Sequence, residues 1–93
     1  MEVKNKQTDT KGNFFIEENG STIAELEYVY AGPDKIIINH TEVNPGQEGK
    51  GLGKILVKAA IDFARANHLK IMPLCPYAKS VFDKTDEYND VLF

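Results

Sequence analysis

The residues of this sequence with the clearest chemical potential are the glycines between Val43 and Gly53, in the stretch VNPGQEGKGLG. Four glycines within eight residues expose successive backbone N–H groups with no Cβ atom in the way. A strongly periodic helix pattern begins at Leu52, so the positive end of a helix dipole adds to these donors. A flexible connector rarely runs directly into such a helix, and the loop therefore favours a phosphate or pyrophosphate ligand.

The spacing of the glycines excludes two common nucleotide-binding motifs. A P-loop would need a glycine where Glu48 stands and a hydroxyl residue where Ile55 stands. The dinucleotide pattern Gly-x-Gly-x-x-Gly needs a third glycine at a position that holds Lys54 or Leu56. The loop is therefore of another phosphate-binding type.

Three antiparallel strands are predicted before this loop. Residues 13–18 and 21–31 flank Asn19-Gly20, which is a strong hairpin signal between two strand-like runs. After the turn Gly32-Pro33-Asp34, residues 35–43 begin with three isoleucines, typical of a central strand. Residues 1–12 are polar, and we expect them to form a flexible segment before a single domain that spans residues 13–93.

After the loop, apolar residues recur at the spacing of one helical face: Leu52, Ile55, Leu56, Ala59, Ala60, Phe63 and Ala64. The helix is expected to end at Asn67-His68, where the helix dipole favours His68. Residues 69–75 are predicted to form a strand parallel to residues 35–43, with a right-handed crossover. Pro73 has no N–H, so this strand should part from its neighbour near its C-terminal end. A short helix around residues 77–84 completes an α/β (α+β) fold.

Composition restricts the possible functions. The 93 residues allow one hydrophobic core and leave no length for a separate substrate-binding domain. A net charge of −3 disfavours broad binding to nucleic acid or to an anionic membrane. The single cysteine, the polar start and the lack of a long apolar run predict a cytoplasmic protein. We expect it to be a monomer. The acidic residues near the C-terminus lack the spacing of a calcium loop, so we predict no metal site and interpret them as a solvated face: Asp83, Asp86, Glu87 and Asp90.

With these elements in place, the loop resembles the coenzyme A-binding motif of the GNAT N-acetyltransferases. That motif reads Arg or Gln, two residues, Gly, one residue, then Gly or Ala, which places its glycines on Gly51 and Gly53. The order of strands, loop, helix, strand and short helix over residues 13–93 is similar to the C-terminal half of the GNAT fold. A branch of very short GNAT-like proteins carries a His-Thr pair before the loop and a Cys after the next strand, here His40-Thr41 and Cys75.

The resemblance implies that acetyl-coenzyme A binds between two splayed parallel strands. It implies cofactor contacts with Val43, Gln47, Glu48, Gly49, Lys50, Gly51, Leu52, Gly53, Lys54, Cys75, Tyr77 and Phe82. Glu48 departs from the family pattern, since it stands where Arg or Gln is usual, and its carboxylate repels a pyrophosphate modestly. Lys50 and Lys54 can compensate, and the backbone N–H groups should carry most of the binding.

The same resemblance suggests catalytic roles for Cys75, His40 and Tyr77. Cys75 could accept the acetyl group as a thiolate, or be a small buried apolar residue. His40 could act as a general base for an amine or for Cys75, or be a structural strand residue. Tyr77 could donate a proton to the departing coenzyme A thiolate, or pack at a helix start. Phe82 is expected to pack against the long helix or the adenine.

Three functions remain open from the sequence. The first is an enzyme that transfers an acetyl group from acetyl-coenzyme A to an unidentified amine, directly or through Cys75. The second is a coenzyme A-binding module with little or no transferase activity, since the N-terminal half of a full GNAT domain is missing. The third is a small partner-binding protein whose loop holds no cofactor.

Overall fold

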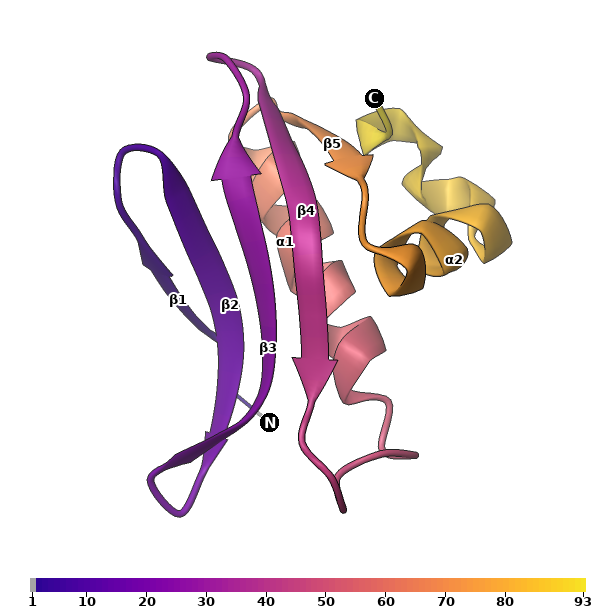
Figure 1. Cartoon of the computed structure of the whole chain (residues 1–93). Coiled ribbons are helices and arrows are strands. Elements are labelled where there is room, and N and C mark those ends of the chain that lie inside the picture. The colour runs from indigo at the N-terminus through magenta and orange to yellow at the C-terminus, as the bar shows by residue number, and fades with distance from the viewer. Residues whose placement is uncertain (1) are drawn as a thin grey trace.

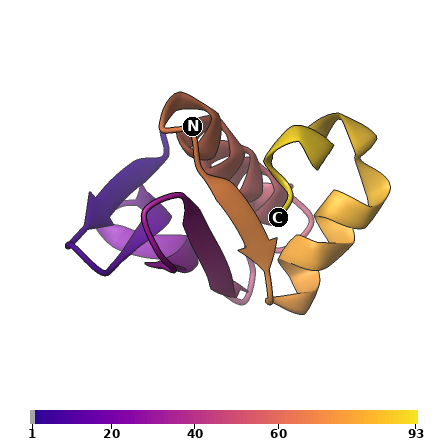
Figure 2. The ribbon, with the colours of Figure 1, turned by 90° about the horizontal axis from the view of Figure 1, so that it is seen from above.

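The computed structural model describes residues 2–93 and contains one five-stranded sheet with helices on one side of it (Figures 1 and 2). The elements in chain order are β1 (Lys4–Gln7), β2 (Lys11–Glu18), β3 (Ser21–Tyr30), β4 (Lys35–Val43), α1 (Leu52–Ala66), β5 (Lys70–Pro73), α2 (Pro76–Lys84) and the 3-10 helix η1 (Asp86–Val91). The strands lie in the order β1-β2-β3-β4-β5, antiparallel except for the parallel pair β4–β5. This confirms the predicted α+β class and the β-loop-α-β unit.

The N-terminal segment differs from the sequence-based expectation. Strand β1 and the first two residues of β2 lie within residues 1–12, where no regular structure was expected; of that range, Met1 lies outside the described residues. All four residues of β1 are exposed, so no apolar alternation marks this strand in the sequence. Its pairing with β2 instead satisfies backbone groups along one edge of the sheet.

Two turns follow from local sequence. Asn19 and Gly20 both have positive φ, at 53° and 81°, as a two-residue hairpin of the predicted kind requires. At the end of α1, Asn67 is the C-cap and its N–H bonds to the carbonyl of Phe63, while His68 adopts a left-handed conformation. The helix therefore ends where the sequence predicted.

Helix α1 covers one face of the sheet and lies behind it in Figure 1. Its buried residues are Leu52, Gly53, Leu56, Val57, Ala60, Ile61 and Ala64. This stripe is rotated from the predicted one, since Ile55 is 36% exposed while Val57 and Ile61 are fully buried. The reason is that α1 packs against α2 and η1 as well as against the sheet, which shifts the centre of its buried face.

Strands β4 and β5 separate after a short paired stretch. Pairing runs from Lys35 opposite Lys70 to Ile38 opposite Pro73 and then stops. The N–H groups of Leu74 and Cys75 both bond to the carbonyl of Ile38, at 3.0 Å each, and the chain then turns into α2. The predicted splay at Pro73 is confirmed, and the rest of β4 has no strand beside it on this edge within residues 2–93.

Strand β4 also contains a bulge at the point where β5 departs. Glu27 of β3 pairs with His40, whereas the next residue, Tyr28, pairs with Ile38, so Asn39 is the extra residue. A bulge bends a strand and re-aims the side chains around it. The bulge therefore falls beside the splay.

The C-terminal segment closes the far edge of the sheet. Arg65 on α1 holds the carboxylate of Asp90 through two hydrogen bonds of 2.9 Å, and the N–H of Phe93 bonds to the carbonyl of Ile71. Asp83 pairs with Lys79 at 3.3 Å.

Within the described part of the chain, no three or more His, Cys, Asp or Glu side chains are grouped to hold a metal ion. None of the helices in residues 2–93 has the length and apolar character needed to cross a membrane.

Candidate active site at the splay between β4 and β5

The glycine-rich loop presents a row of unused backbone donors. Across residues 2–93, the N–H groups from Gly49 through Lys54 donate no hydrogen bond, and no side chain caps the N-terminus of α1. Gly49 and Gly51 have φ of 83° and 75°, a conformation that favours glycine, and a Cβ at either would meet nothing within 4 Å. The space in front of these donors is open, so the loop fits an anionic group such as a pyrophosphate.

The side chains of the loop leave this row free. The Glu48 carboxylate accepts a hydrogen bond of 2.8 Å from the N–H of Gly46, at the start of the loop. Lys50 donates to the side-chain oxygen of Gln47 at 2.7 Å, and Lys54 is exposed in the first turn of α1. The carboxylate of Glu48 is thus bonded at the start of the loop, and Lys50 and Lys54 lie within the row of donors from Gly49 to Lys54.

Cys75 lies at the N-cap of α2, just beyond the splay. Its side chain is buried, at 7% exposure, and Sγ lies 3.5 Å from the hydroxyl oxygen of Thr41 on β4. The fold therefore joins the end of β5 to the unpaired part of β4 through this contact.

The surroundings of Cys75 favour its thiolate. Burial by itself raises the pKa of the thiol, but hydrogen bonds from the Thr41 hydroxyl and from the backbone N–H groups of Ala78, Tyr77 and Thr41 outweigh it, and the pKa lies below the ordinary value. A helix N-terminus adds to this effect because its dipole stabilises negative charge. A lowered pKa increases the fraction of thiolate present at a given pH.

Tyr77 connects the glycine-rich loop with this cysteine. A Cβ at Gly53 would lie 2.7 Å from Cε2 of Tyr77 and 2.8 Å from its hydroxyl oxygen, so the ring packs directly on the bare glycine. The ring is 39% exposed, and its hydroxyl makes no hydrogen bond to any residue from 2 to 93. Partial burial raises the pKa of Tyr77, which keeps the phenol protonated and able to donate.

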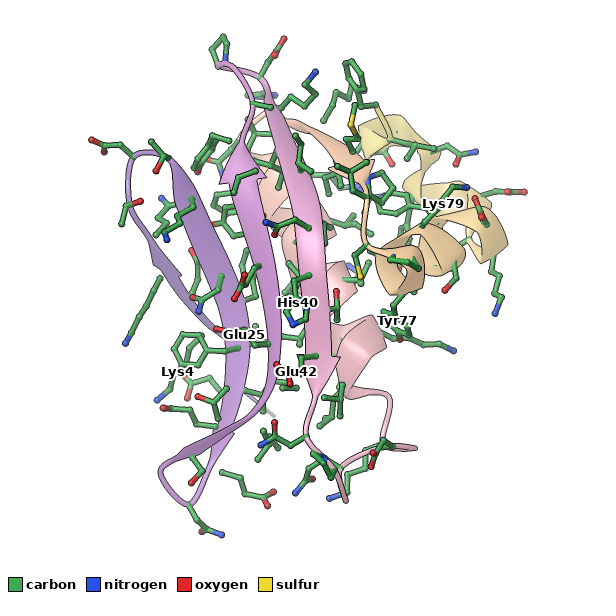
Figure 3. All side chains as sticks on the ribbon, in the orientation of Figure 1. Lys4, Glu25, His40, Glu42, Tyr77 and Lys79 are labelled. Carbon is green, nitrogen blue, oxygen red and sulfur yellow. The ribbon has the colours of Figure 1, made fainter. Side chains whose placement is uncertain are left out.

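His40 lies on the opposite face of the sheet from Cys75. It pairs with Glu27, whereas Thr41 pairs with the fully buried Leu26, and neighbouring residues of a strand point to opposite faces. Figure 3 shows His40 with Glu25 and Glu42 on the sheet face away from α1. The interpretation of His40 as a base for Cys75 does not fit this geometry. The geometry does fit a role of His40 toward an acceptor that approaches from the sheet face opposite α1.

We call the sheet face that carries Glu25, Glu27, His40 and Glu42 the open face. With three carboxylates, it is strongly acidic near the splay. His40 Nε2 lies 3.5 Å from the carboxylate of Glu42, and both side chains are more than half exposed. A protonated amine is attracted to such a surface.

Other predicted cofactor contacts fall in different places. The side chain of Leu52 is buried, at 2% exposure, so only its backbone N–H faces the open loop. Val43 and Gln47 are half-buried at the start of the loop. Phe82 is a core residue, 3% exposed and packed edge-on against Tyr88, so its ring is not part of the loop surface.

Sequence reasoning missed two residues that this geometry brings into the site. Thr41 was noted as part of a His-Thr pair, but its contact with Cys75 depends on two strands that are far apart in the chain. Asn39 was not singled out, because a bulge in a β-branched run leaves no glycine or proline signal.

Together the fold and the site define a small α+β domain with a glycine-rich loop of free backbone donors near a splayed parallel strand pair. The chain belongs to the GCN5-related N-acetyl-transferase family, whose model matches residues 13–91. The family confirms the resemblance drawn from the glycine-rich loop.

The chain is also similar to individual proteins. The chain is 38% identical to a GCN5-like protein from Staphylococcus aureus with a known solution structure; the match has a TM-score of 0.72 and covers 97% of this chain and 87% of that one. Protein NATD1 of Xenopus tropicalis is 41% identical over 54 residues, which are 58% of this chain and 50% of that protein, so the match spans half the length of this relative. The ribosomal-protein-S18-alanine N-acetyltransferase of Escherichia coli has a TM-score of 0.70 at 19% identity, over 84% of this chain and 53% of that one, and shares the fold.

Proposed function

We propose that this protein binds acetyl-coenzyme A and transfers the acetyl group to an amine. The observation that carries the proposal is the alignment of three features along one path: the free N–H groups of Gly49–Lys54, the Tyr77 ring on Gly53, and the Cys75–Thr41 contact at the splay. A pyrophosphate held by the loop leaves an attached arm free to extend past Tyr77 toward Cys75.

When bound, acetyl-coenzyme A supplies an acetyl group activated as a thioester, whose carbon–sulfur bond breaks as the new bond to the acceptor forms. Backbone donors from Gly49 to Lys54 hold the anionic part, and Lys50 and Lys54 add positive charge. His40 accepts the proton that the amine loses on the open face, and Tyr77 donates a proton to the departing sulfur. Cys75 serves either as an intermediate acetyl carrier, through its thiolate, or as a polar wall of the site.

The arrangement favours a route in which the two reactants approach from different faces. The loop and Cys75 lie on the α1 side of the sheet, and His40 lies on the open face. After Ile38, β4 has no strand paired with it on the β5 side, so the two faces of the sheet are connected along this stretch. Direct attack by the amine and attack through Cys75 both fit this placement, and they differ in whether an acetylated protein forms.

Thermal melting and mass spectrometry, each with and without acetyl-coenzyme A, test the proposal. Binding should raise the melting temperature, and Gly51→Asp should remove this effect without unfolding the protein, since a carboxylate would repel the pyrophosphate. If Cys75 is an acetyl carrier, one acetyl group should appear on its peptide without any acceptor, and Cys75→Ser should abolish the adduct but keep the thermal stabilisation.

Three results would count against parts of this proposal. A protein whose melting is unchanged at millimolar coenzyme A has no cofactor site in the loop. Stabilisation without turnover on any amine would indicate a coenzyme A-binding module instead of an enzyme. Acetyl groups on Lys50 or Lys54, with none on Cys75, would indicate unselective acylation beside the bound cofactor.

A further inference from the structure

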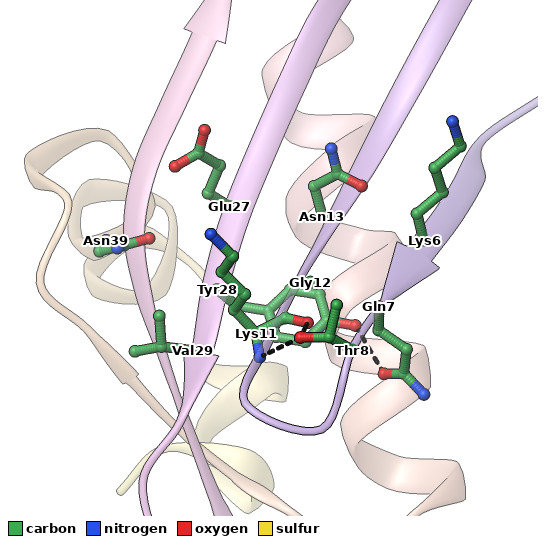
Figure 4. Close-up of a pocket in the computed structure, with 10 residues that line it drawn as sticks. All are labelled: Lys6, Gln7, Thr8, Lys11, Gly12, Asn13, Glu27, Tyr28, Val29 and Asn39. Carbon is green, nitrogen blue, oxygen red and sulfur yellow. Dashed lines mark hydrogen bonds between the residues drawn. The ribbon is translucent and has the colours of Figure 1, made fainter.

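Glu48 is held in a different way from most acidic side chains of this protein. Four carboxylates form ion pairs with a lysine or an arginine, at 2.6 to 3.3 Å: Glu17, Asp62, Asp83 and Asp90. In a hollow on the open face, Figure 4 shows the Lys11 ammonium beside Glu27. Glu48 forms no ion pair with any residue from 2 to 93. Its partner is instead the backbone N–H of Gly46, at 2.8 Å.

This bond belongs to a turn that is anchored to the sheet. Asn44 is tied to β3 by two hydrogen bonds of 2.9 Å, one from its N–H and one from its side-chain amide. The N–H of Gln47 then bonds to the carbonyl of Asn44 at 3.0 Å. Pro45 and Gly46, with φ of 87° at Gly46, are the central residues, as in a type II turn. That turn uses the N–H of Gln47, so the N–H of Gly46 is left for Glu48.

The row of free donors begins at the residue after Glu48. Gly49 and Gly51 have open space around them and a backbone that many conformations suit, so the loop has little to hold it by itself. The Glu48–Gly46 bond connects this row to the anchored turn. A loop that is ordered before the ligand arrives loses less conformational entropy on binding. Glu48 therefore prepares the donors for an anion.

The same carboxylate also opposes that anion. Glu48 is the only acidic residue from 43 to 61, and the first turn of α1 contains no acidic residue. A pyrophosphate on the N–H groups of Gly49–Lys54 comes close to its negative charge, and the repulsion is modest because the side chain is exposed. A glutamine at this position would keep an acceptor oxygen for Gly46 and lose the charge. The two effects of Glu48 can therefore be separated.

We propose that Glu48 is a positioning residue, which orders the pyrophosphate-binding loop through Gly46, and that its charge at the same time limits the affinity for coenzyme A. A lower affinity speeds the release of product coenzyme A, because differences in affinity at one site lie mostly in the dissociation rate. This inference rests on the proposed binding of acetyl-coenzyme A, because it concerns the affinity of that same site.

Two substitutions at Glu48 separate charge from hydrogen bonding. By calorimetric titration, Glu48→Gln should lower the Kd for coenzyme A about threefold, since only the repulsion is lost. Glu48→Ala loses the bond as well and should bind about threefold more weakly than Glu48→Gln. Asp34→Asn, on the β3–β4 turn at the opposite end of the sheet (Figure 1), is the control for net charge and should not change the Kd.

Each half of the proposal has a result that overturns it. If Glu48→Gln binds no more tightly than the wild type, the charge does not limit affinity. If Glu48→Ala binds as tightly as Glu48→Gln, the bond to Gly46 does not position the donors. An equal gain in Asp34→Asn would assign the effect to the net charge of the protein.

Salt and a smaller ligand locate the repulsion. In about 1 M salt, where the Debye length is about 3 Å, the gain of Glu48→Gln over the wild type should shrink. The difference between Glu48→Gln and Glu48→Ala should persist, because it comes from a hydrogen bond. Dephospho-coenzyme A lacks the 3′-phosphate and keeps the pyrophosphate, so Glu48→Gln should show the same gain with it. A gain seen only with coenzyme A would overturn the assignment to the pyrophosphate.

A measurement without ligand separates this inference from the proposed transfer. Amide hydrogen exchange at Gly46 and Gln47, followed by NMR, should be about threefold faster in Glu48→Ala than in the wild type and unchanged in Glu48→Gln. Equal rates in all three proteins would overturn the positioning role, even where coenzyme A binds and turnover is present. If coenzyme A binds none of them, the transfer function and the limit on affinity both fail, while faster exchange in Glu48→Ala still supports the ordering of the loop.

Discussion

Two tyrosines in this protein pack on bare glycines, and the two contacts have different consequences. Tyr28 fills the space beside Gly12, and Tyr77 fills the space beside Gly53, with would-be Cβ contacts of 2.4 and 2.7 Å. Tyr28 is fully buried and its hydroxyl is bonded to Asn5 and Gln7. Tyr77 is 39% exposed and its hydroxyl has no partner among residues 2–93.

The difference shows that burial and hydrogen bonding, more than the contact itself, separate a structural tyrosine from one available for chemistry. A buried hydroxyl that has lost water needs its partners, because an unsatisfied buried group costs free energy. A half-exposed hydroxyl without a partner keeps its capacity to donate to a ligand. Substitutions at the Tyr28–Gly12 contact should therefore change stability, and those at the Tyr77–Gly53 contact should change transfer.

The largest effect is expected from Gly12→Ala. The new Cβ would collide with Tyr28 and with Cβ of Gln7, and the fully buried ring has no space to move into. Overpacking of this kind should lower the free energy of unfolding by about 3 kcal/mol, measured by denaturant titration. Thr10→Ala, on the same hairpin, is the control and should stay within about 0.5 kcal/mol of the wild type. An equally small effect of Gly12→Ala would mean that Tyr28 is not confined.

Removal of each hydroxyl gives the next largest contrast. Tyr28→Phe should lower the free energy of unfolding by about 1 kcal/mol, because the side chains of Asn5 and Gln7 each lose one hydrogen bond and keep another, to Asn13 and Tyr30. Tyr77→Phe should leave stability nearly unchanged and lower the rate of acetyl transfer about tenfold, since a thiolate needs only modest help in leaving. The comparison fails if Tyr77→Phe destabilises the protein as much as Tyr28→Phe does.

A smaller effect is expected from Gly53→Ala. The displaced Tyr77 ring can move into solvent, and alanine gains about 1 kcal/mol over glycine in a helix, so the net change in stability should be small. Transfer should fall about fivefold because the phenol is no longer held over the first turn of α1. Thermal melting and steady-state kinetics of the same preparation check both parts. Unchanged kinetics would show that the position of Tyr77 does not matter.

The smallest effect is expected for the pKa of the Cys75 thiol. Hydrogen bonds, with Thr41 foremost, hold the pKa of Cys75 below its ordinary value, so removing one of them should raise that pKa. If Cys75 is the acetyl carrier, only its thiolate attacks, and the rate of acetylation should rise with pH through the pKa of this thiol. In Thr41→Val the midpoint of the rate–pH profile should move to higher pH, while Thr10→Val should leave it in place. A midpoint that stays or moves lower would contradict the assignment of Thr41.

Much of the glycine-rich loop and its surroundings could be predicted from the sequence because the signals are local. The glycines of the loop, the helix that starts at Leu52 and the break at Pro73 act within a few residues of chain, through backbone conformation and hydrogen-bonding capacity. The loop, the helix and the splay occur in the structure where these residues predicted them. The order of β2, β3 and β4 also follows, since each turn joins neighbours, and the crossover through α1 places β5 beside β4.

The arrangement of the open face depended on tertiary structure. Strand β1 has no apolar alternation, and its place is fixed by Tyr28 reaching under Gly12 to Gln7, a contact across twenty-one residues. The bulge at Asn39 and the alternation of β4 separate His40 from Cys75, although both were candidates for one reaction. The sequence by itself determined the types of groups and the glycine-rich loop that is proposed to bind an anion. Which groups share a face was decided only by strand register, because one extra residue in a strand reverses the direction of every side chain after it.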